Sequence, residues 1–117
     1  MSQISVSKSF EFDSAHRLRH HQGKCQNLHG HTYKVEVEVE GPVGERGSAT
    51  GMVADFGVIS KVVRGILYEG DWCKKKIVPF DHSTMLHEED PLAELLEKHF
   101  PDMQVLKMTQ EPTAEYM

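Results

Sequence analysis

The sequence lacks the features that define several large classes of protein. It has 117 residues, and no apolar run in it approaches the roughly 18 residues of a membrane-spanning helix. The first eight residues lack the apolar core of a secretory signal. Only two cysteines are present, Cys25 and Cys73, which does not indicate a disulfide framework. We therefore expect free thiols, a cytoplasmic location and no contact with membranes.

Basic residues are fewer than acidic residues in this sequence. The chain has 13 Lys and Arg against 18 Asp and Glu, for a net charge of -5. A nucleic-acid surface needs a clustered basic footprint, and the small cluster of Arg17, Arg19 and Lys24 is a poor one, so we expect no nucleic-acid partner. The hydrophobic fraction of 38% and the charged fraction of 26% are typical of a globular domain. By contrast, the eight histidines are an unusual excess.

Two segments alternate between apolar and polar residues with the period of two that a half-buried β-strand requires. Residues 4–16 form the first, and their apolar positions are in phase with His16. Residues 29–40 form the second, in which His29 and His31 share the parity of the apolar side chains. We expect an antiparallel pair joined by the polar loop 17–28, with the three histidines close together on the buried face.

Helices are predicted at two places. Asp55 is the expected N-cap of an amphipathic helix whose apolar positions are Ile59, Val62, Val63, Ile66 and Leu67. Asp90-Pro91 combines a capping carboxylate with a proline at the first helical position, and the buried face of the helix that follows is expected to be Leu92, Leu95, Leu96 and Phe100. A turn is predicted over residues 41–48, a strand over 103–108 and the start of a helix over 111–115, whereas residues 68–80 have no clear pattern.

Three imidazoles on one face of a strand pair suit a metal ion. Catalytic zinc is typically held by three protein ligands that leave a fourth position open, and a His-x-His pair on a strand supplies two of them. His16 can supply the third, whereas His20 and His21 lie in the polar loop and diverge. The alternative is a set of buried histidines hydrogen-bonded in the core, although several imidazoles facing one apolar pocket are costly without partners.

Cys25 lies four residues before His29 and is open to two interpretations. It could be a fourth ligand that closes a structural site, or a thiolate base or nucleophile beside a metal or a protonated histidine. We favour the reactive thiol, because Cys73 has no cysteine at the short spacing of structural zinc sites. Asp81-His82 is a second candidate, since a carboxylate can suit an imidazole to proton transfer, but an isolated dipeptide of this kind is common by chance.

Five short blocks occur in order along nearly the whole chain. They are Phe12-Asp13-Ser14-Ala15-His16, Cys25-x3-His29-Gly30-His31, Gly51-Met52-Val53-Ala54-Asp55-Phe56, Asp81-His82 and Pro112-Thr113-Ala114-Glu115. Each block alone is weak, but together they resemble the 6-pyruvoyltetrahydropterin synthase family. The three residues between the cysteine and His-Gly-His resemble its 6-carboxytetrahydropterin synthase branch, which serves queuosine biosynthesis.

The resemblance implies an α+β tunnelling fold. In this fold a small antiparallel sheet with helices packed on one face joins copies of itself into a β-barrel, and active sites lie between the subunits of the homo-oligomer. The implied site residues are the zinc ligands His16, His29 and His31, the base Cys25, its proton-relay partners Asp81 and His82, and the pterin-binding Thr113 and Glu115.

The implied activity is that of a zinc-dependent lyase. It would convert the small molecule 7,8-dihydroneopterin triphosphate to 6-carboxy-5,6,7,8-tetrahydropterin, releasing acetaldehyde and triphosphate, with zinc acting as a Lewis acid. From charge and position alone, Arg17, Arg19 and Lys24 are predicted to contact the triphosphate. The alternatives are a synthase of the 6-pyruvoyl product, a folate-pathway pterin enzyme, and a non-catalytic zinc-binding module.

The family pattern continues past Thr-Ala-Glu with a helix and a final strand whose glutamate anchors the pterin ring, and this sequence contains neither. We therefore expect residues 1–117 to form a single tunnelling-fold domain that lacks these two elements. Residues 68–80 also form a longer connection than is usual before Asp-His. If Met117 is the natural end, the zinc site can form without the two missing elements, whereas pterin affinity and the barrel would suffer. The alternative is that this sequence is a truncated version of a longer chain.

Overall fold

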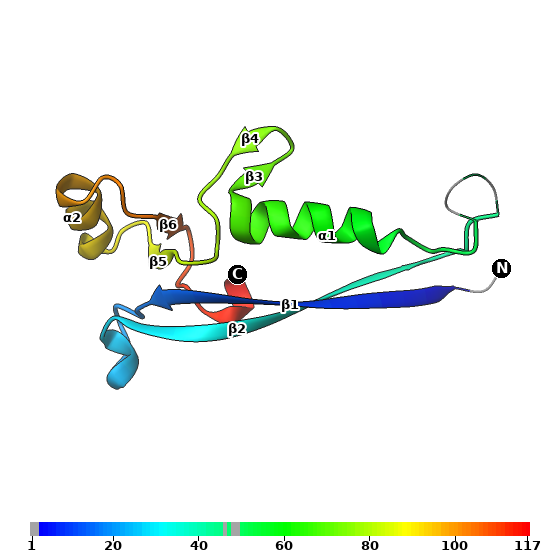
Figure 1. Ribbon diagram of the computed structural model, residues 1–117. Coiled ribbons are helices and arrows are strands. Elements are labelled where there is room, and N and C mark those ends of the chain that lie inside the picture. Colours follow the sequence, from blue (N-terminus) through cyan, green and yellow to red (C-terminus); the bar gives the residue numbers. More distant parts are fainter. Residues whose placement is uncertain (1–2, 46, 48–49) are drawn as a thin grey trace.

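The computed structural model describes residues 3–45, 47 and 50–117, and its main feature is a long ribbon of two antiparallel strands (Figure 1). Strand β1 spans Ile4–His16 and strand β2 spans His29–Gly41. They pair over their whole length, with Phe12 opposite Tyr33 and His16 opposite His29. The strand pair predicted from the period-two alternation is therefore confirmed.

Two short strands widen the sheet at the end of the ribbon where the histidines lie. Strand β5 (Thr84–His87) pairs with β1, and strand β6 (Val105–Met108) pairs with β5, which gives the order β2-β1-β5-β6. Both of these pairings are parallel, so the prediction of an antiparallel sheet is wrong and the sheet is mixed. Strand β2 ends opposite the start of β1, and the connection from β2 to β5 brings the chain back to the other end of the ribbon, so that β5 runs in the direction of β1. Strands β5 and β6 are joined by a helical crossover, which makes consecutive strands parallel.

Helix α1 (Phe56–Arg64) runs along the ribbon (Figure 1). It begins at the predicted cap, where the Asp55 carboxylate accepts a hydrogen bond of 2.7 Å from the Gly57 N–H. A turn of π-helix, Gly65–Glu69, continues it and buries Leu67 against Phe10 and Phe12. This cluster is the core of the ribbon, and it fixes the face on which the histidines project.

Helix α2 (Pro91–His99) begins at Asp90 as predicted, and the Asp90 carboxylate accepts from the Leu92 N–H. Its buried residues are Ala93 and Leu96. Leu95 is 52% exposed and Phe100 is 56% exposed, so their assignment to the buried face is wrong. The helix is short, and the strands that it covers are only four residues long, so a narrow stripe of its surface is buried.

The two helices pack on different faces of the sheet. Helix α2 contacts Leu86 and Val105, which the strand register places on the side of Ala15, because Ala15 pairs with Thr84 and Thr84 pairs with Val105. Helix α1 packs on the opposite side, against Phe12. The prediction that the helices pack on one face is therefore wrong. Met85 and Leu86, adjacent residues of β5, are both fully buried, and a strand that is buried on both faces needs cover on both.

The segment without a clear sequence pattern contains a small hairpin of strands β3 (Asp71–Trp72) and β4 (Lys75–Lys76). Cys73 and Lys74 form its turn with positive φ angles of 49° and 65°, as a two-residue hairpin of the primed type requires. The helix start predicted over residues 111–115 is a single 3-10 turn, Ala114–Tyr116. The turn predicted over residues 41–48 includes residues 46 and 48, which lie outside the described residues.

The molecule is elongated. Its radius of gyration is 17.7 Å, whereas a compact chain of this length would have about 13 Å. No helix in the described part of the chain is long and apolar enough to cross a membrane. The three histidines predicted as metal ligands gather at one end of this long shape, where β1 ends and β2 begins.

Candidate metal centre

His16, His29 and His31 come together where β1 ends and β2 begins. His16 is the last residue of β1 and lies opposite His29, and the alternation of β2 places His31 on the same side. One ring nitrogen of each histidine lies within 4.8 Å of the others. His16 is buried, His29 is half-buried and His31 is exposed, so the cluster opens to solvent on the side of His31.

Backbone carbonyls fix the tautomers of two of these rings. His16 Nδ1 lies 2.7 Å from the Pro112 carbonyl oxygen, and His29 Nδ1 lies 2.7 Å from that of Asn27. Because a carbonyl oxygen only accepts hydrogen bonds, both Nδ1 atoms carry their proton. The Nε2 atoms of the two rings face each other at a distance of 3.0 Å, and in the neutral form of each ring this atom carries a lone pair.

Two facing lone pairs need a positive charge between them. A proton is disfavoured at His16, since burial lowers its pKa, and the neighbouring His29 and His31 lower it further, although the Pro112 carbonyl opposes them. A metal cation satisfies all three nitrogens at once, and a ligating histidine typically donates its other N–H to a carbonyl in this way. Three imidazoles with an open side therefore fit a metal such as zinc.

Cys25 lies in a 3-10 turn, Lys24–Gln26, in the loop between β1 and β2. Its carbonyl accepts a hydrogen bond of 2.8 Å from the Leu18 N–H, which closes the loop, and the residue after the turn is Asn27, the partner of His29. The Cys25 side chain is a half-buried free thiol. Among the described residues, the ligand atoms that cluster are the three imidazoles, without a thiol, His20 or His21. Cys25 is therefore not one of the clustered ligand atoms.

Asp81 and His82 form a second polar centre. The Asp81 carboxylate accepts from the Asp13 N–H at 3.0 Å and lies 2.8 Å from His82 Nδ1. Burial by itself would raise the pKa of the Asp81 carboxyl, but these two hydrogen bonds hold it below its ordinary value. The backbone of His82 is left-handed, with φ 60°, and its N–H donates to the Asp13 carbonyl. Strained conformations of this kind concentrate at functional sites.

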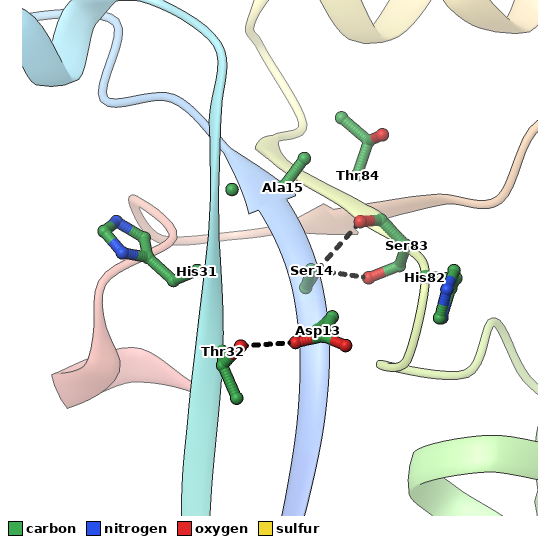
Figure 2. A pocket seen from close by; sticks show the side chains of 9 residues that line it. Asp13, Ser14, Ala15, His31, Thr32, His82, Ser83 and Thr84 are labelled. Carbon is green, nitrogen blue, oxygen red and sulfur yellow. Dashed lines mark hydrogen bonds between the residues drawn. The ribbon is translucent and has the colours of Figure 1, made fainter.

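An open cleft of about 470 Å³ lies beside His82. Its lining residues are Asp13, Ser14, Ala15, Gly30, His31, Thr32, His82, Ser83 and Thr84. Figure 2 shows the His31 ring pointing away from the side chains of Asp13, Thr32 and His82. This follows from strand alternation, because Thr32 points to the face opposite that of His31 and hydrogen-bonds to Asp13. Within one chain, the His31 ring and the Asp81-His82 pair thus face different sides of the ribbon.

The remaining predicted site residues lie near the end of the described chain. Thr113 is the N-cap of the 3-10 turn after Pro112, the partner of His16, and Glu115 lies within that turn. The Glu115 carboxylate is held by its own backbone N–H and by the Thr113 hydroxyl, which lower its pKa. Both residues therefore follow directly after the residue whose carbonyl contacts His16, although neither belongs to the histidine cluster.

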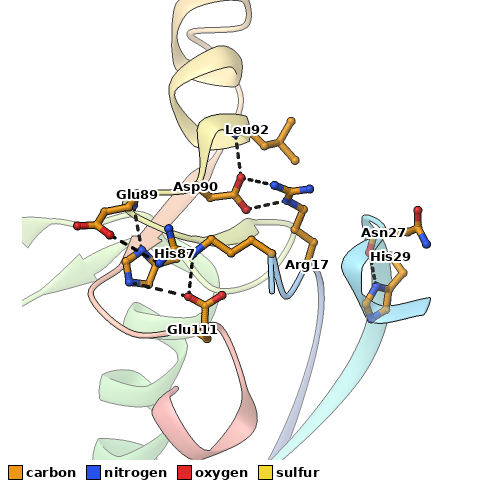
Figure 3. A network of polar contacts seen from close by, with 9 residues as sticks. Arg17, Asn27, His29, His87, Glu89, Asp90, Leu92 and Glu111 are labelled. Carbon is orange, nitrogen blue, oxygen red and sulfur yellow. Dashed lines mark hydrogen bonds and ion pairs between the residues drawn. The ribbon is translucent and has the colours of Figure 1, made fainter. Parts of the chain in front are cut away.

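Two of the three basic residues predicted to contact triphosphate are paired with carboxylates, and Figure 3 shows the pair of Arg17 with Asp90. Arg17 Nε and Arg17 NH2 each lie 2.7 Å from an oxygen of Asp90, whose side chain is 1% exposed. Arg19 pairs with Glu111 at 3.2 Å and with Glu89 at 3.6 Å. We therefore no longer assign the triphosphate to Arg17 or Arg19, because their charges stabilise the fold around the cluster.

Some of the residues that shape this centre have no signal in the sequence. Pro112 belongs to a predicted block, but it acts through its backbone carbonyl, which residue type does not reveal. Asp90 was predicted only as a helix cap, and its partner Arg17 is 73 positions away. Glu111 likewise contacts Arg19 across 92 positions. Contacts at this separation depend on the sheet order, which strand alternation does not determine.

The chain thus has a mixed α/β fold with a three-histidine cluster, at the end of a strand pair, that could hold a metal ion. A sequence model of the family described as 6-pyruvoyl tetrahydropterin synthase matches residues 5–117. The chain belongs to this family.

The relatives carry a consistent description. A protein of Haemophilus influenzae named 6-carboxy-5,6,7,8-tetrahydropterin synthase is 39% identical over 99 residues, which cover 81% of this chain and 64% of that protein. One of the same name from Rickettsia bellii is 35% identical over 96% of this chain and 72% of its own length. A crystal structure of an uncharacterized protein from Wolinella succinogenes superposes with a TM-score of 0.61 and 27% identity, covering 87% of this chain and 54% of that one.

The chain therefore spans somewhat less than two thirds of the Haemophilus protein and about half of the Wolinella protein. It contains the strand pair with the histidines. What the longer relatives do as whole proteins is not transferred to this chain by similarity alone.

Proposed function

We propose that this chain binds zinc through His16, His29 and His31 and acts in a 6-carboxy-5,6,7,8-tetrahydropterin synthase of queuosine biosynthesis. The substrate is 7,8-dihydroneopterin triphosphate, and the products are 6-carboxytetrahydropterin, acetaldehyde and triphosphate. The observation that carries this proposal is the pair of anchored imidazoles whose Nε2 atoms face each other at 3.0 Å. The names of the Haemophilus and Rickettsia relatives support the choice of product.

The chemistry of bound zinc is that of a Lewis acid that polarises hydroxyl and carbonyl oxygens of the substrate side chain. The exposed position of His31 leaves room for those oxygens on the open side of the cluster. Cys25, beside the turn that anchors His29, takes protons from the side-chain carbons in its thiolate form. Thr113 and Glu115, which follow the residue that anchors His16, help hold the pterin.

Asp81 and His82 serve as the second acid and base. Asp81 fixes the His82 ring at Nδ1, which leaves Nε2 to exchange protons with the substrate. This pair faces the side of the ribbon opposite the metal cluster, as Figure 2 shows for His31 and His82. We therefore propose that each active site combines the cluster and Cys25 of one copy with Asp81-His82 of another copy. A homo-oligomer, with the barrel typical of the family, would bring them together.

The direct test is product identification. Purified protein is incubated with 7,8-dihydroneopterin triphosphate and zinc, and the pterin products are separated and weighed by mass spectrometry. The proposal expects the 6-carboxy product together with acetaldehyde. The 6-pyruvoyl product would instead indicate the activity after which the family is named.

A second arm tests the length of the chain. The protein is compared with a form extended at its C-terminus, because the relatives are longer. Turnover by the extended form alone would show that this chain is a zinc-binding module without catalysis of its own. Turnover by neither form, with zinc bound, would contradict the proposed reaction.

A further inference from the structure

The shortest contact of His16 Nδ1 is with a carbonyl group that is far away in the sequence, and the Tyr33 hydroxyl lies at the longer distance of 3.4 Å. His16 is bonded through Nδ1 to Pro112, at 2.7 Å and across 96 positions. Pro112 follows strand β6 and is almost fully buried. Because the His16 ring can turn about its side-chain bonds, the position of this carbonyl decides where Nε2 points.

Glu111, the residue before Pro112, is held by side chains from two other segments. Its Oε2 accepts from Arg19 Nε at 3.2 Å, and Arg19 lies in the loop after β1. His87, the last residue of β5, accepts from the Glu89 N–H at Nδ1, so its proton is on Nε2, 3.9 Å from the same oxygen. Figure 3 shows His87, Glu89 and Glu111 gathered around this network.

The network ties together the ends of three neighbouring strands, β1, β5 and β6. A residue before proline is restricted to extended conformations, so fixing the Glu111 side chain also limits the position of the Pro112 carbonyl. The Arg19 side chain is 18% exposed and that of His87 is 12% exposed, so solvent screens this contact less than it would a surface ion pair.

The other oxygen of Glu111 indicates that this site is not optimised for stability alone. Glu111 Oε1 is buried and has no hydrogen-bond partner within the described part of the chain. A buried acceptor without a partner opposes folding, and such groups in native proteins are typically retained for a function. We therefore infer that a glutamate is retained at position 111 for its negative charge beside Arg19.

We propose that Glu111 is a positioning residue for the metal centre, which acts through Arg19 and the Pro112 carbonyl to hold His16 in its metal-binding orientation. The inference rests on the proposed metal site and adds a residue that touches neither the metal nor the substrate. In this arrangement the three imidazoles are the metal ligands, and Glu111 tunes the affinity with which they bind the metal.

The test compares two glutamate variants of equal size. Glu111→Gln keeps the shape of the side chain and removes its charge, whereas Glu97→Gln does the same in α2, where Glu97 pairs with Lys107 at 2.9 Å. Zinc affinity is measured by competition with a coloured chelator at fixed pH and salt. Loss of a group behind a ligating histidine typically weakens metal binding roughly 10- to 100-fold. We expect this loss for Glu111→Gln and a change within about twofold for Glu97→Gln.

A double-mutant cycle with Arg19→Gln distinguishes a joint role from two separate ones. If Arg19 and Glu111 act as a unit, the double variant binds zinc no more weakly than either single variant. Losses that simply multiply would overturn the proposal, as would wild-type affinity in Glu111→Gln. If Glu111→Gln does not fold, Arg19→Lys, which keeps the charge and loses the Nε geometry, is expected to weaken binding in the same direction.

A measurement on the metal-free protein separates this inference from the proposed function. The nitrogen chemical shifts of the His16 ring report its tautomer by NMR. We expect Nδ1–H in the wild type and in Glu97→Gln, and a mixture of tautomers in Glu111→Gln. If the wild type did not bind zinc, the proposed metal site would be wrong. The positioning role would be rejected by a different result, namely a His16 tautomer that Glu111→Gln leaves unchanged.

Discussion

His16 and His29 face each other through Nε2 at 3.0 Å, and each ring is anchored at Nδ1 by a carbonyl from a different part of the chain. The anchor of His29 is local, since Asn27 lies two residues before it. The anchor of His16 is Pro112, at the other end of the described chain. The centre is therefore assembled by tertiary structure on one side and by a tight loop on the other.

The first prediction concerns the ligands. His29→Ala and His31→Ala should each lose most of the bound metal, because two imidazoles and water hold zinc far less tightly than three imidazoles do. Zinc per chain is measured by atomic absorption after dialysis against buffer. The control is His99→Ala, at the end of α2 and outside the cluster, which should keep the metal. Stoichiometric zinc in both ligand variants would rule out the three-histidine site.

The second prediction concerns the thiol. Cys25→Ala should keep its zinc and lose product formation, because Cys25 is not among the clustered ligand atoms. The expected loss is roughly 100-fold or more, as is typical when a proton-transferring group is removed. Zinc content and turnover are measured on the same preparation. Cys73→Ala, at the exposed hairpin turn, is the matched control and should change neither. Loss of zinc from Cys25→Ala would make the thiol a ligand.

The sequence predicts those parts of this centre that depend on local periodicity. Strand alternation places His16, His29 and His31 on one face, and the structure brings them together there. The caps Asp55 and Asp90 are equally local, since each accepts a hydrogen bond from a backbone N–H two residues ahead.

What the sequence does not predict depends on how distant segments pack. Strand β5 has four residues and is buried on both faces, so it shows no alternation by which a strand could be recognised. Its parallel pairing with β1 brings Asp81-His82 next to Asp13, and it also leaves a second face for α2 to cover. Arg17, predicted as a phosphate contact, pairs with Asp90 for the same reason.

The third prediction concerns stability. Asp90→Asn preserves a capping side chain for α2 but leaves Arg17 without its anionic partner. The Asp90 side chain is 1% exposed and that of Arg17 is 25% exposed, so the pair is only partly buried. The variant should therefore lose about 2–3 kcal/mol of unfolding free energy at pH 7, which is less than a fully buried pair would lose. Urea unfolding measures it. The control, Asp71→Asn, removes an exposed pair with Lys76 and should cost less than about 1 kcal/mol.

The fourth prediction concerns how the stability difference between wild type and Asp90→Asn depends on pH. Burial opposes ionisation of Asp90, but hydrogen bonds from Arg17 and the Leu92 N–H lower its pKa in the folded protein below the ordinary 3.8. The stability from the ionised carboxylate is thus present above the unfolded pKa and is lost as the pH falls through the folded pKa. The difference in unfolding free energy between wild type and Asp90→Asn should therefore shrink below pH 4. A difference that stays constant down to pH 2 would contradict this linkage.

The last prediction tests whether active sites are shared between copies. Cys25→Ala and His82→Ala should each abolish turnover, since each removes one of the two proton-transferring groups from every site. When the two variants are mixed, unfolded and refolded together, mixed oligomers form. If Cys25 acts with His82 of a neighbouring copy, about one quarter of the sites in a random equal mixture receive both intact residues. If both residues came from one chain, every site would keep one defect and activity would stay absent.

Figure 2, in which His31 and His82 face different sides of the ribbon, favours recovery of activity in the mixed oligomers. Activity is followed by pterin product formation, and co-refolded wild type and His82→Ala calibrate the expected fraction. No recovery in oligomers shown to be mixed would overturn the shared site.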